Sequence, residues 1–144
     1  MVLEVLAAAI GSFAFSILFG VPRKYYLYCG LIGGCSWVAY LLFENFGTVI
    51  ACMASTIVVV LLSRIMAIRE KCPVTIFLIS GIFPLVPGSY VYWTAYYLVM
   101  NEVKQATATG YMAVKIAFAI VLGIVFVFEI PQKFFALFRK RECT

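Results

Sequence analysis

Two prolines and two glycines interrupt a long uncharged stretch of this chain. Residues 72–101 carry no charge, and Gly81, Pro84, Pro87 and Gly88 lie near the middle of the stretch. A proline in a helix interior removes a hydrogen bond and clashes with the preceding turn, at a cost of about 3 kcal/mol. In hydrocarbon, such a break persists only where protein buries it or where it lines a wet cavity. The spacing therefore predicts an interrupted membrane helix, and the interruption is the candidate site.

The interruption would present backbone amides that can bind an anion. Ser89 follows the break and is placed to cap the second half of the helix, whose first N–H groups have no partner within the helix. These donors and the positive end of the helix dipole suit a carboxylate, and transporters with discontinuous helices use this device near the bilayer midplane. A proline kink satisfied by neighbouring helices is the alternative. The candidate substrate-binding residues at the break are Pro84, Pro87, Gly88 and Ser89.

Aromatic residues follow the break at close spacing: Tyr90, Tyr92, Trp93, Tyr96 and Tyr97. They could line a vestibule, in which Tyr92 is a candidate substrate contact, or they could form the outer interfacial belt of aromatic residues.

A lysine interrupts the last apolar run, one to two turns from the expected outer surface. An ionisable residue within a span is a candidate functional residue, so Lys115 could balance a substrate carboxylate. The alternative is that its long stem extends to the nearby interface.

The chain lacks the residue types that most enzyme and metal sites require. It contains no histidine, and no nucleophile is paired with a base by a recognisable spacing. The five cysteines show no C-x-x-C spacing, and three of them fall within apolar runs, so we expect no disulfide, metal site or cofactor. The sequence predicts that the protein is not an enzyme.

The composition indicates a membrane protein. Of 144 residues, 65% are hydrophobic and 12% are charged, with a mean hydropathy of +1.08, whereas soluble domains are about half apolar. Five apolar runs approach the length of about 20 residues that crosses a bilayer. We therefore expect an all-α polytopic protein that forms a single membrane domain over residues 1–144. Its predicted spans are about residues 2–21, 25–43, 47–67, 73–100 and 110–130, followed by a basic tail at 131–144.

The basic residues predict the orientation of this arrangement. Nine of the eleven fall on one side, in the first and third connections and in the tail. Cytoplasmic loops carry an excess of Lys and Arg, so the N-terminus is expected outside and the C-terminus in the cytoplasm. Arg64 and Arg69 would anchor the inner end of the third span by snorkelling. The net charge of +5 thus indicates orientation in a lipid bilayer rather than nucleic-acid binding.

Three glycines in the second span, Gly30, Gly33 and Gly34, form a G-x-x-x-G spacing with one extra glycine. Small residues let membrane helices approach closely. The spacing favours helix packing, and a backbone that faces a substrate is the alternative.

Four segments resemble the threonine/serine exporter family, and more closely its carboxyl-terminal membrane module. They are residues 82–88 (IFPLVPG) with Tyr90 or Tyr92 after them, residues 19–23 (FGVPR), residues 28–33 (YCGLIG), and an ending in which Pro131 precedes aromatic residues and an Arg-Lys-Arg run at 139–141. The likeness covers nearly the whole chain.

The resemblance implies proton-driven export of small amino acids, threonine and serine, and for some two-subunit members export of small dicarboxylates. In that family the module is either fused behind a larger amino-terminal half or made as a separate small subunit, and this chain is similar to the separate form. The resemblance therefore implies a larger polytopic partner, a small carboxylate-bearing metabolite as substrate, and a multi-pass location in the plasma (inner) membrane of the cell.

Two other functions fit the same sequence. A scaffold or assembly subunit would use the small-residue faces to hold a larger membrane protein without transporting anything itself. A homo-oligomer could form a passive channel, whose flux would not depend on a proton gradient. Substrate binding at the break distinguishes the exporter from the scaffold.

Overall fold

The computed structural model describes residues 2–130, and within them the chain is helical without strands. The predicted all-α class is confirmed, and the predicted tail at 131–144 lies outside the described residues. The α-helices are α1 (Val2–Leu18), α2 (Tyr26–Phe43), α3 (Thr48–Glu70), α4 (Val74–Ile82), α5 (Gly88–Val99) and α6 (Val103–Phe128); three short 3₁₀ turns are η1 (Arg23–Tyr25), η2 (Glu44–Phe46) and η3 (Phe83–Leu85).

Three to four segments are long and apolar enough to cross a membrane. They are α2 with its flanking turns, α3 and α6, and a fourth if α4 with η3 and α5 together form one bent span. Helix α1 has 17 residues, which is about 26 Å at 1.5 Å per residue and short of a hydrocarbon core of about 30 Å. These helices indicate that the chain is a multi-pass membrane protein. The count of five spans and the orientation stay predictions.

The first predicted span is too long by three residues, because a glycine ends α1. Gly20 has a φ of +67°, a left-handed conformation that glycine adopts without steric cost. Its N–H donates to the carbonyl of Ile17 (3.1 Å), and the N–H of Val21 donates to the carbonyl of Ser16 (3.0 Å). This pair of bonds is the Schellman motif that closes many helices.

The last predicted span begins too late. The predicted spans at 73–100 and 110–130 leave residues 101–109 as a connection, but α6 begins at Val103. The polar side chains are accommodated within the helix, because the hydroxyls of Thr107 and Thr109 donate to the carbonyls of Val103 (2.8 Å) and Gln105 (2.9 Å). Only a tight turn, with Asn101 at a φ of 64°, separates α5 from α6.

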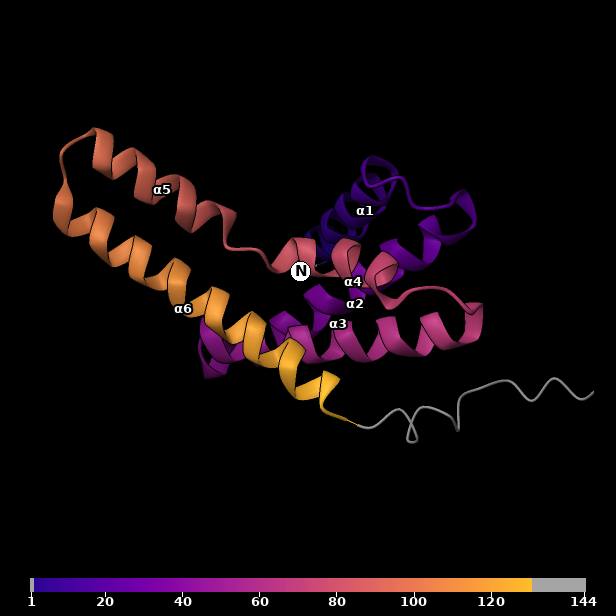
Figure 1. Ribbon diagram of the computed structural model, residues 1–144. Helices are drawn as coiled ribbons and strands as arrows, with labels where there is room; N and C mark the ends of the chain where they lie inside the picture. The colour runs from indigo at the N-terminus through magenta and orange to yellow at the C-terminus, as the bar shows by residue number, and fades with distance from the viewer. Residues whose placement is uncertain (1, 131–144) are drawn as a thin grey trace, which may run out of the picture.

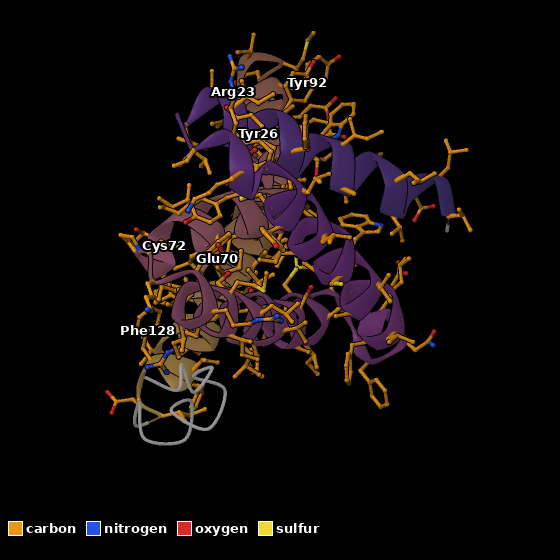
Figure 2. All side chains as sticks on the ribbon, turned by 90° about the vertical axis from the view of Figure 1, so that its right-hand side faces the viewer. Arg23, Tyr26, Glu70, Cys72, Tyr92 and Phe128 are labelled. Atoms are coloured by element: carbon orange, nitrogen blue, oxygen red, sulfur yellow. The ribbon has the colours of Figure 1, made fainter. Side chains whose placement is uncertain are left out.

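The helices form two groups that meet at the break. Helix α1 packs on α2, α2 packs on α3, and α4 lies against both α2 and α3. Helix α6 crosses α3 and pairs with α5, and these two form a hairpin that extends away from the other helices (Figure 1). Tyr92 of α5 and Phe128 of α6 lie at opposite ends of the molecule (Figure 2). Helix α5 contains no buried residue, so its outer surface is open to lipid or to another chain.

Helix α4 is fixed in the core between α2 and α3. Phe77 is fully buried and meets the ring of Tyr25 edge to face, with 5.4 Å between centroids. At Gly81, an added Cβ would lie 2.7 Å from Ile32 Cγ2 and 2.9 Å from Val59 Cγ1. Glycine is therefore what allows α4 to approach both neighbouring helices at this point.

The three glycines of α2 lie on the face that contacts α1. An added Cβ at Gly33 would overlap the side chain of Ser12, and one at Gly30 would lie 3.3 Å from the carbonyl oxygen of Ala9. At Gly34 the nearest atom, Ala9 Cβ, would lie at 3.4 Å. This geometry supports the packing interpretation of the G-x-x-x-G spacing.

A buried arginine joins α3 to the end of α6. Arg64 Nη1 donates to the carbonyls of Val127 (2.5 Å) and Ile130 (3.1 Å), and its guanidinium lies 5.3 Å from the ring centre of Phe128. The expectation that Arg64 snorkels to the interface was wrong, because carbonyls at the end of α6 and just beyond it provide acceptors inside the protein. Arg69 is exposed, as a snorkelling residue would be.

We expect Gly33→Ala to lower the free energy of unfolding by about 1–3 kcal/mol, because the added methyl group forces α1 and α2 apart. Gly11→Ala on α1 is the matched control, since nothing lies within 4 Å of an added Cβ there. Unfolding of the purified protein by SDS in mixed micelles, followed by circular dichroism, measures the difference. Equal stability of the two variants would contradict the close α1–α2 contact.

We expect Arg64→Gln to lower the free energy of unfolding by about 2 kcal/mol, because charge-assisted bonds to the end of α6 are lost inside the protein. Arg69→Gln removes an exposed arginine from the same helix and should change stability by no more than about 0.5 kcal/mol. The same unfolding titration compares them, and a matching loss in both variants would argue against the Arg64 contact.

Candidate functional site

The second proline of the break sets its geometry. The residue before a proline is driven out of the helical conformation by the proline ring, and Val86 is extended, with φ −62° and ψ 129°. Pro84 instead sits at the start of η3, where no N–H is needed, and Phe83 before it stays helical. The helical segments Val74–Leu85 and Gly88–Val99 are bent by 51°. The predicted interruption is therefore present, and Pro87 causes it.

Helix α5 begins without a side-chain cap. Its N-cap position is occupied by Pro87, which has no side-chain oxygen, and Ser89 lies inside the first turn. The prediction that Ser89 caps the helix was wrong, because the helix starts one residue before it. The N–H of Gly88 donates to the carbonyl of Val86 (2.7 Å) and that of Val91 to the carbonyl of Pro87 (3.1 Å). Between them, the N–H groups of Ser89 and Tyr90 have no acceptor in the helix itself.

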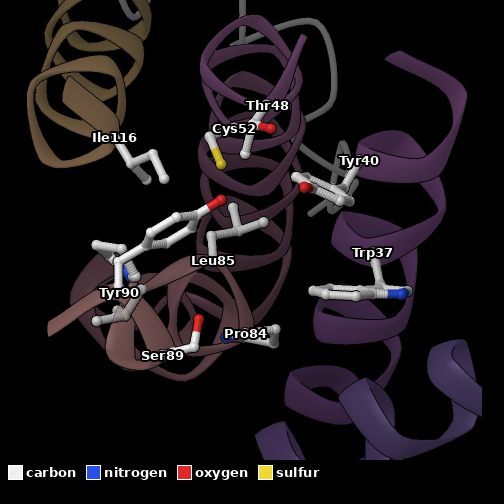
Figure 3. Close-up of a pocket in the computed structure, with 11 residues that line it drawn as sticks. Trp37, Tyr40, Thr48, Cys52, Pro84, Leu85, Ser89, Tyr90 and Ile116 are labelled. Carbon is white, nitrogen blue, oxygen red and sulfur yellow. The ribbon is translucent and has the colours of Figure 1, made fainter. Parts of the chain in front are cut away.

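The break lines a pocket of about 100 Å³. Four helices and the break contribute its walls (Figure 3). The lining residues are Trp37 and Tyr40 of α2, Thr48 and Cys52 of α3, Pro84 to Pro87 of the break, Ser89 and Tyr90 of α5, and Ile116 of α6. The pocket therefore provides the surroundings in which an irregular backbone is tolerated at membrane depth.

The lining combines hydroxyl groups, aromatic rings and apolar side chains. Tyr40, Thr48, Ser89 and Tyr90 carry hydroxyls, and the Tyr90 hydroxyl points toward Cys52 and Thr48 (Figure 3). The rings of Trp37 and Tyr40 stack with 5.1 Å between centroids. No lining residue is charged. Such a site suits a small solute whose charges are met by backbone dipoles and aromatic faces.

One pocket wall is connected to a carboxylate at the start of α1. Trp37 Nε1 donates to Glu4 Oε2 at 3.4 Å.

Among residues 2–130, no group of three or more His, Cys, Asp or Glu could hold a metal ion.

Three predicted site residues line the pocket and three do not. Pro84, Pro87 and Ser89 belong to the lining. Gly88 lies between two of them but is exposed, and an added Cβ would meet nothing within 4 Å. Neither its φ nor its surroundings therefore require glycine. The other two, Tyr92 and Lys115, lie on the outer surface.

The outer positions of Tyr92 and Lys115 separate them from the pocket. Tyr92 is 63% exposed and contacts the ring of Trp93. Lys115 is exposed, with its Nζ 4.3 Å from the ring centre of Tyr111, while the next residue, Ile116, faces the pocket. The structure does not bring these two side chains together with the break, so their part in binding stays a prediction.

The pocket lies beside the end of α2 and the beginning of α3. Trp37 and Tyr40 occupy the last two turns of α2, and Thr48 is the first residue of α3. The break was expected near the middle of the membrane. Relative to α2 and α3, it lies close to the connection between them.

Sequence reasoning missed most of the residues that the break faces. Tyr40 and Thr48 flank a short connection, with Trp37 one turn before and Cys52 one turn after. This helical spacing of aromatic and polar residues at two adjoining helix ends was the available signal. Which helix lies opposite the break is a tertiary property, so the signal could not be assigned to the site.

A comparison with protein families explains the combination of apolar helices and a broken span. The family described as "Threonine/Serine exporter, ThrE" matches residues 4–130, which include every described pocket residue. No curated protein matches the chain, and no solved structure matches it. Since the match covers most of the sequence, the chain belongs to the threonine/serine exporter family.

Proposed function

We propose that this chain is a membrane subunit of a secondary exporter for the small amino acids threonine and serine, and that the pocket at the break binds the substrate. The observation that carries the proposal is the pocket itself. The chain belongs to an exporter family. Its pocket is lined by the first residues of α5, where backbone N–H groups lack acceptors in the helix, and by hydroxyl groups from α2, α3 and α5. A kink that served only to bend a helix would not need such a lining.

The substrate carboxylate would bind at the start of α5. The N–H groups of Ser89 and Tyr90 and the positive end of the helix dipole favour a negative charge there. The ammonium group would face the rings of Trp37, Tyr40 and Tyr90, whose π-systems attract cations. The absence of a cationic side chain from the lining favours a zwitterion with one carboxylate over a dicarboxylate.

The finer features of the exporter are part of the same proposal. We propose five spans with the N-terminus outside, location in the plasma or inner membrane, proton coupling, and action with a larger polytopic partner. The open outer surface of α5, which buries no residue of its own, supports the partner, because a second chain could pack there. A scaffold subunit or a passive homo-oligomeric channel would leave the pocket without a role.

We expect Pro87→Ala to reduce threonine export at least tenfold while the protein still inserts, because Val86 would be free to return to a helical conformation and close the break. Gly88→Leu should reduce export much less, since Gly88 is exposed outside the pocket lining and nothing lies within 4 Å of an added Cβ there. Efflux from preloaded cells measures both, with membrane insertion checked by blotting.

Pro73→Ala is the matched control for this series. Pro73 precedes α4 and does not line the pocket, so export should stay near the wild-type level. Wild-type efflux from the Pro87→Ala variant would remove the break from the mechanism.

We expect threonine to slow the labelling of Cys52 by a maleimide at least threefold in a variant in which Cys52 is the only cysteine. The Cys52 side chain is buried and lines the pocket, so a bound substrate would block access to its thiol. A variant in which only Cys72 remains is the control, since Cys72 lies in the α3–α4 connection, outside the pocket. Labelling of Cys52 that is indifferent to threonine and serine would count against binding in this pocket.

A further inference from the structure

We propose that Ile116 of α6 sets the largest substrate side chain that the pocket accepts. This inference rests on the proposed function and adds the residue that determines specificity. Ile116 is the lining residue that α6 contributes, and it is only 2% exposed.

The pocket has two ends, and the start of α5 lies at only one of them. Ser89 and Pro84 lie at one end, where the start of α5 would hold the carboxylate (Figure 3). Ile116 and Cys52 lie at the other end (Figure 3). A substrate anchored by its carboxylate would therefore direct its side chain toward Ile116 and Cys52.

The wall that carries Ile116 cannot retreat to admit a larger substrate side chain, because α6 is held against α3 beyond this point. At Gly123, an added Cβ would lie 3.0 Å from Thr56 Cβ and 3.1 Å from the carbonyl oxygen of Met53, so the two helices are in close contact. Arg64 binds the carbonyls at the end of α6. The isoleucine itself is stiff, since a β-branched side chain in a helix has one strongly preferred rotamer.

A rigid wall in a pocket of about 100 Å³ implies a sharp limit on the size of the substrate side chain. Protein interiors are close-packed and relax only partly when a side chain is shortened. Replacing Ile116 by alanine removes three carbon atoms and would leave room for a longer substrate side chain. Discrimination by one methylene in such a pocket is worth about tenfold or more in specificity.

The test compares Ile116→Ala with Ile120→Ala in the full chain, expressed in cells together with any partner. Ile120 lies one turn further along α6 and is also buried, but it does not line the pocket. Efflux of threonine, serine, valine and leucine is measured from cells loaded with each. We expect Ile116→Ala to raise the ratio of leucine to threonine efflux about tenfold, and Ile120→Ala to leave the ratio unchanged.

A second measurement does not depend on transport. It uses the variant in which Cys52 is the only cysteine and compares the rates at which Cys52 reacts with a bulky and with a small maleimide. Ile116→Ala should raise the ratio of the bulky to the small rate. Ile116→Val, which changes the fold least, should raise this ratio to a smaller extent. Ile120→Ala should not change this ratio.

The outcomes separate the inference from the proposed function. An unchanged leucine-to-threonine ratio in Ile116→Ala, with threonine still exported, overturns the inference and leaves the function standing. An equal shift in both alanine variants also overturns it, because general loosening of α6 would then be the cause. If wild-type cells export neither threonine nor serine, the function fails, and the Cys52 reaction still decides whether Ile116 limits the pocket.

Discussion

Inside a membrane, each backbone N–H and C=O needs a partner within the protein, and the rest of this structure is arranged around the place where that is hardest to achieve. Pro87 drives Val86 out of the helical conformation. Two backbone hydrogen bonds form directly after the break: the N–H of Gly88 donates to the carbonyl of Val86, and that of Val91 donates to the carbonyl of Pro87. Ser89 and Tyr90, which follow at the start of α5, line a pocket whose other walls come from α2, α3, α6 and the break itself.

The surrounding helices can serve as rigid walls because small residues bring them together. Gly33 meets Ser12 between α1 and α2, and Gly81 lies between α2 and α3. The buried hydroxyls mostly bond within their own helices, as Ser36 does to the carbonyl of Gly33 (2.7 Å) and Thr56 to that of Cys52 (2.7 Å). Polar bonds between α1, α2 and α3 include those from Ser55 to the carbonyl of Ser36 and from Trp37 to Glu4, and close van der Waals contact supplies the rest.

The sequence was sufficient to predict what depends on local rules. Charge-free runs indicated the helices, and the steric effect of proline located the interruption within a residue or two. The exact helix ends depended on local bonds, whereas the direction of single side chains depended on partners remote in sequence. Arg64 contacts the end of α6 instead of the interface. For Lys115 the sequence left two positions open, and the structure places it on the outer surface while Ile116 faces the pocket. A difference of one residue changes the direction of a side chain by about 100° on a helix, and only the packed neighbour decides which direction is buried.

The break also separates two groups of helices that are held by different contacts. Helix α4 is fixed against α2 and α3, whereas α5 contacts α6 near Gly110, where an added Cβ would lie 3.3 Å from Thr94 Cγ2. Further along, α6 is fastened to α3 through Gly123 and Arg64. Ile116 lies between these two attachments and faces the pocket. Because both attachments lie on α6, the part of the pocket wall that carries Ile116 is held from either side.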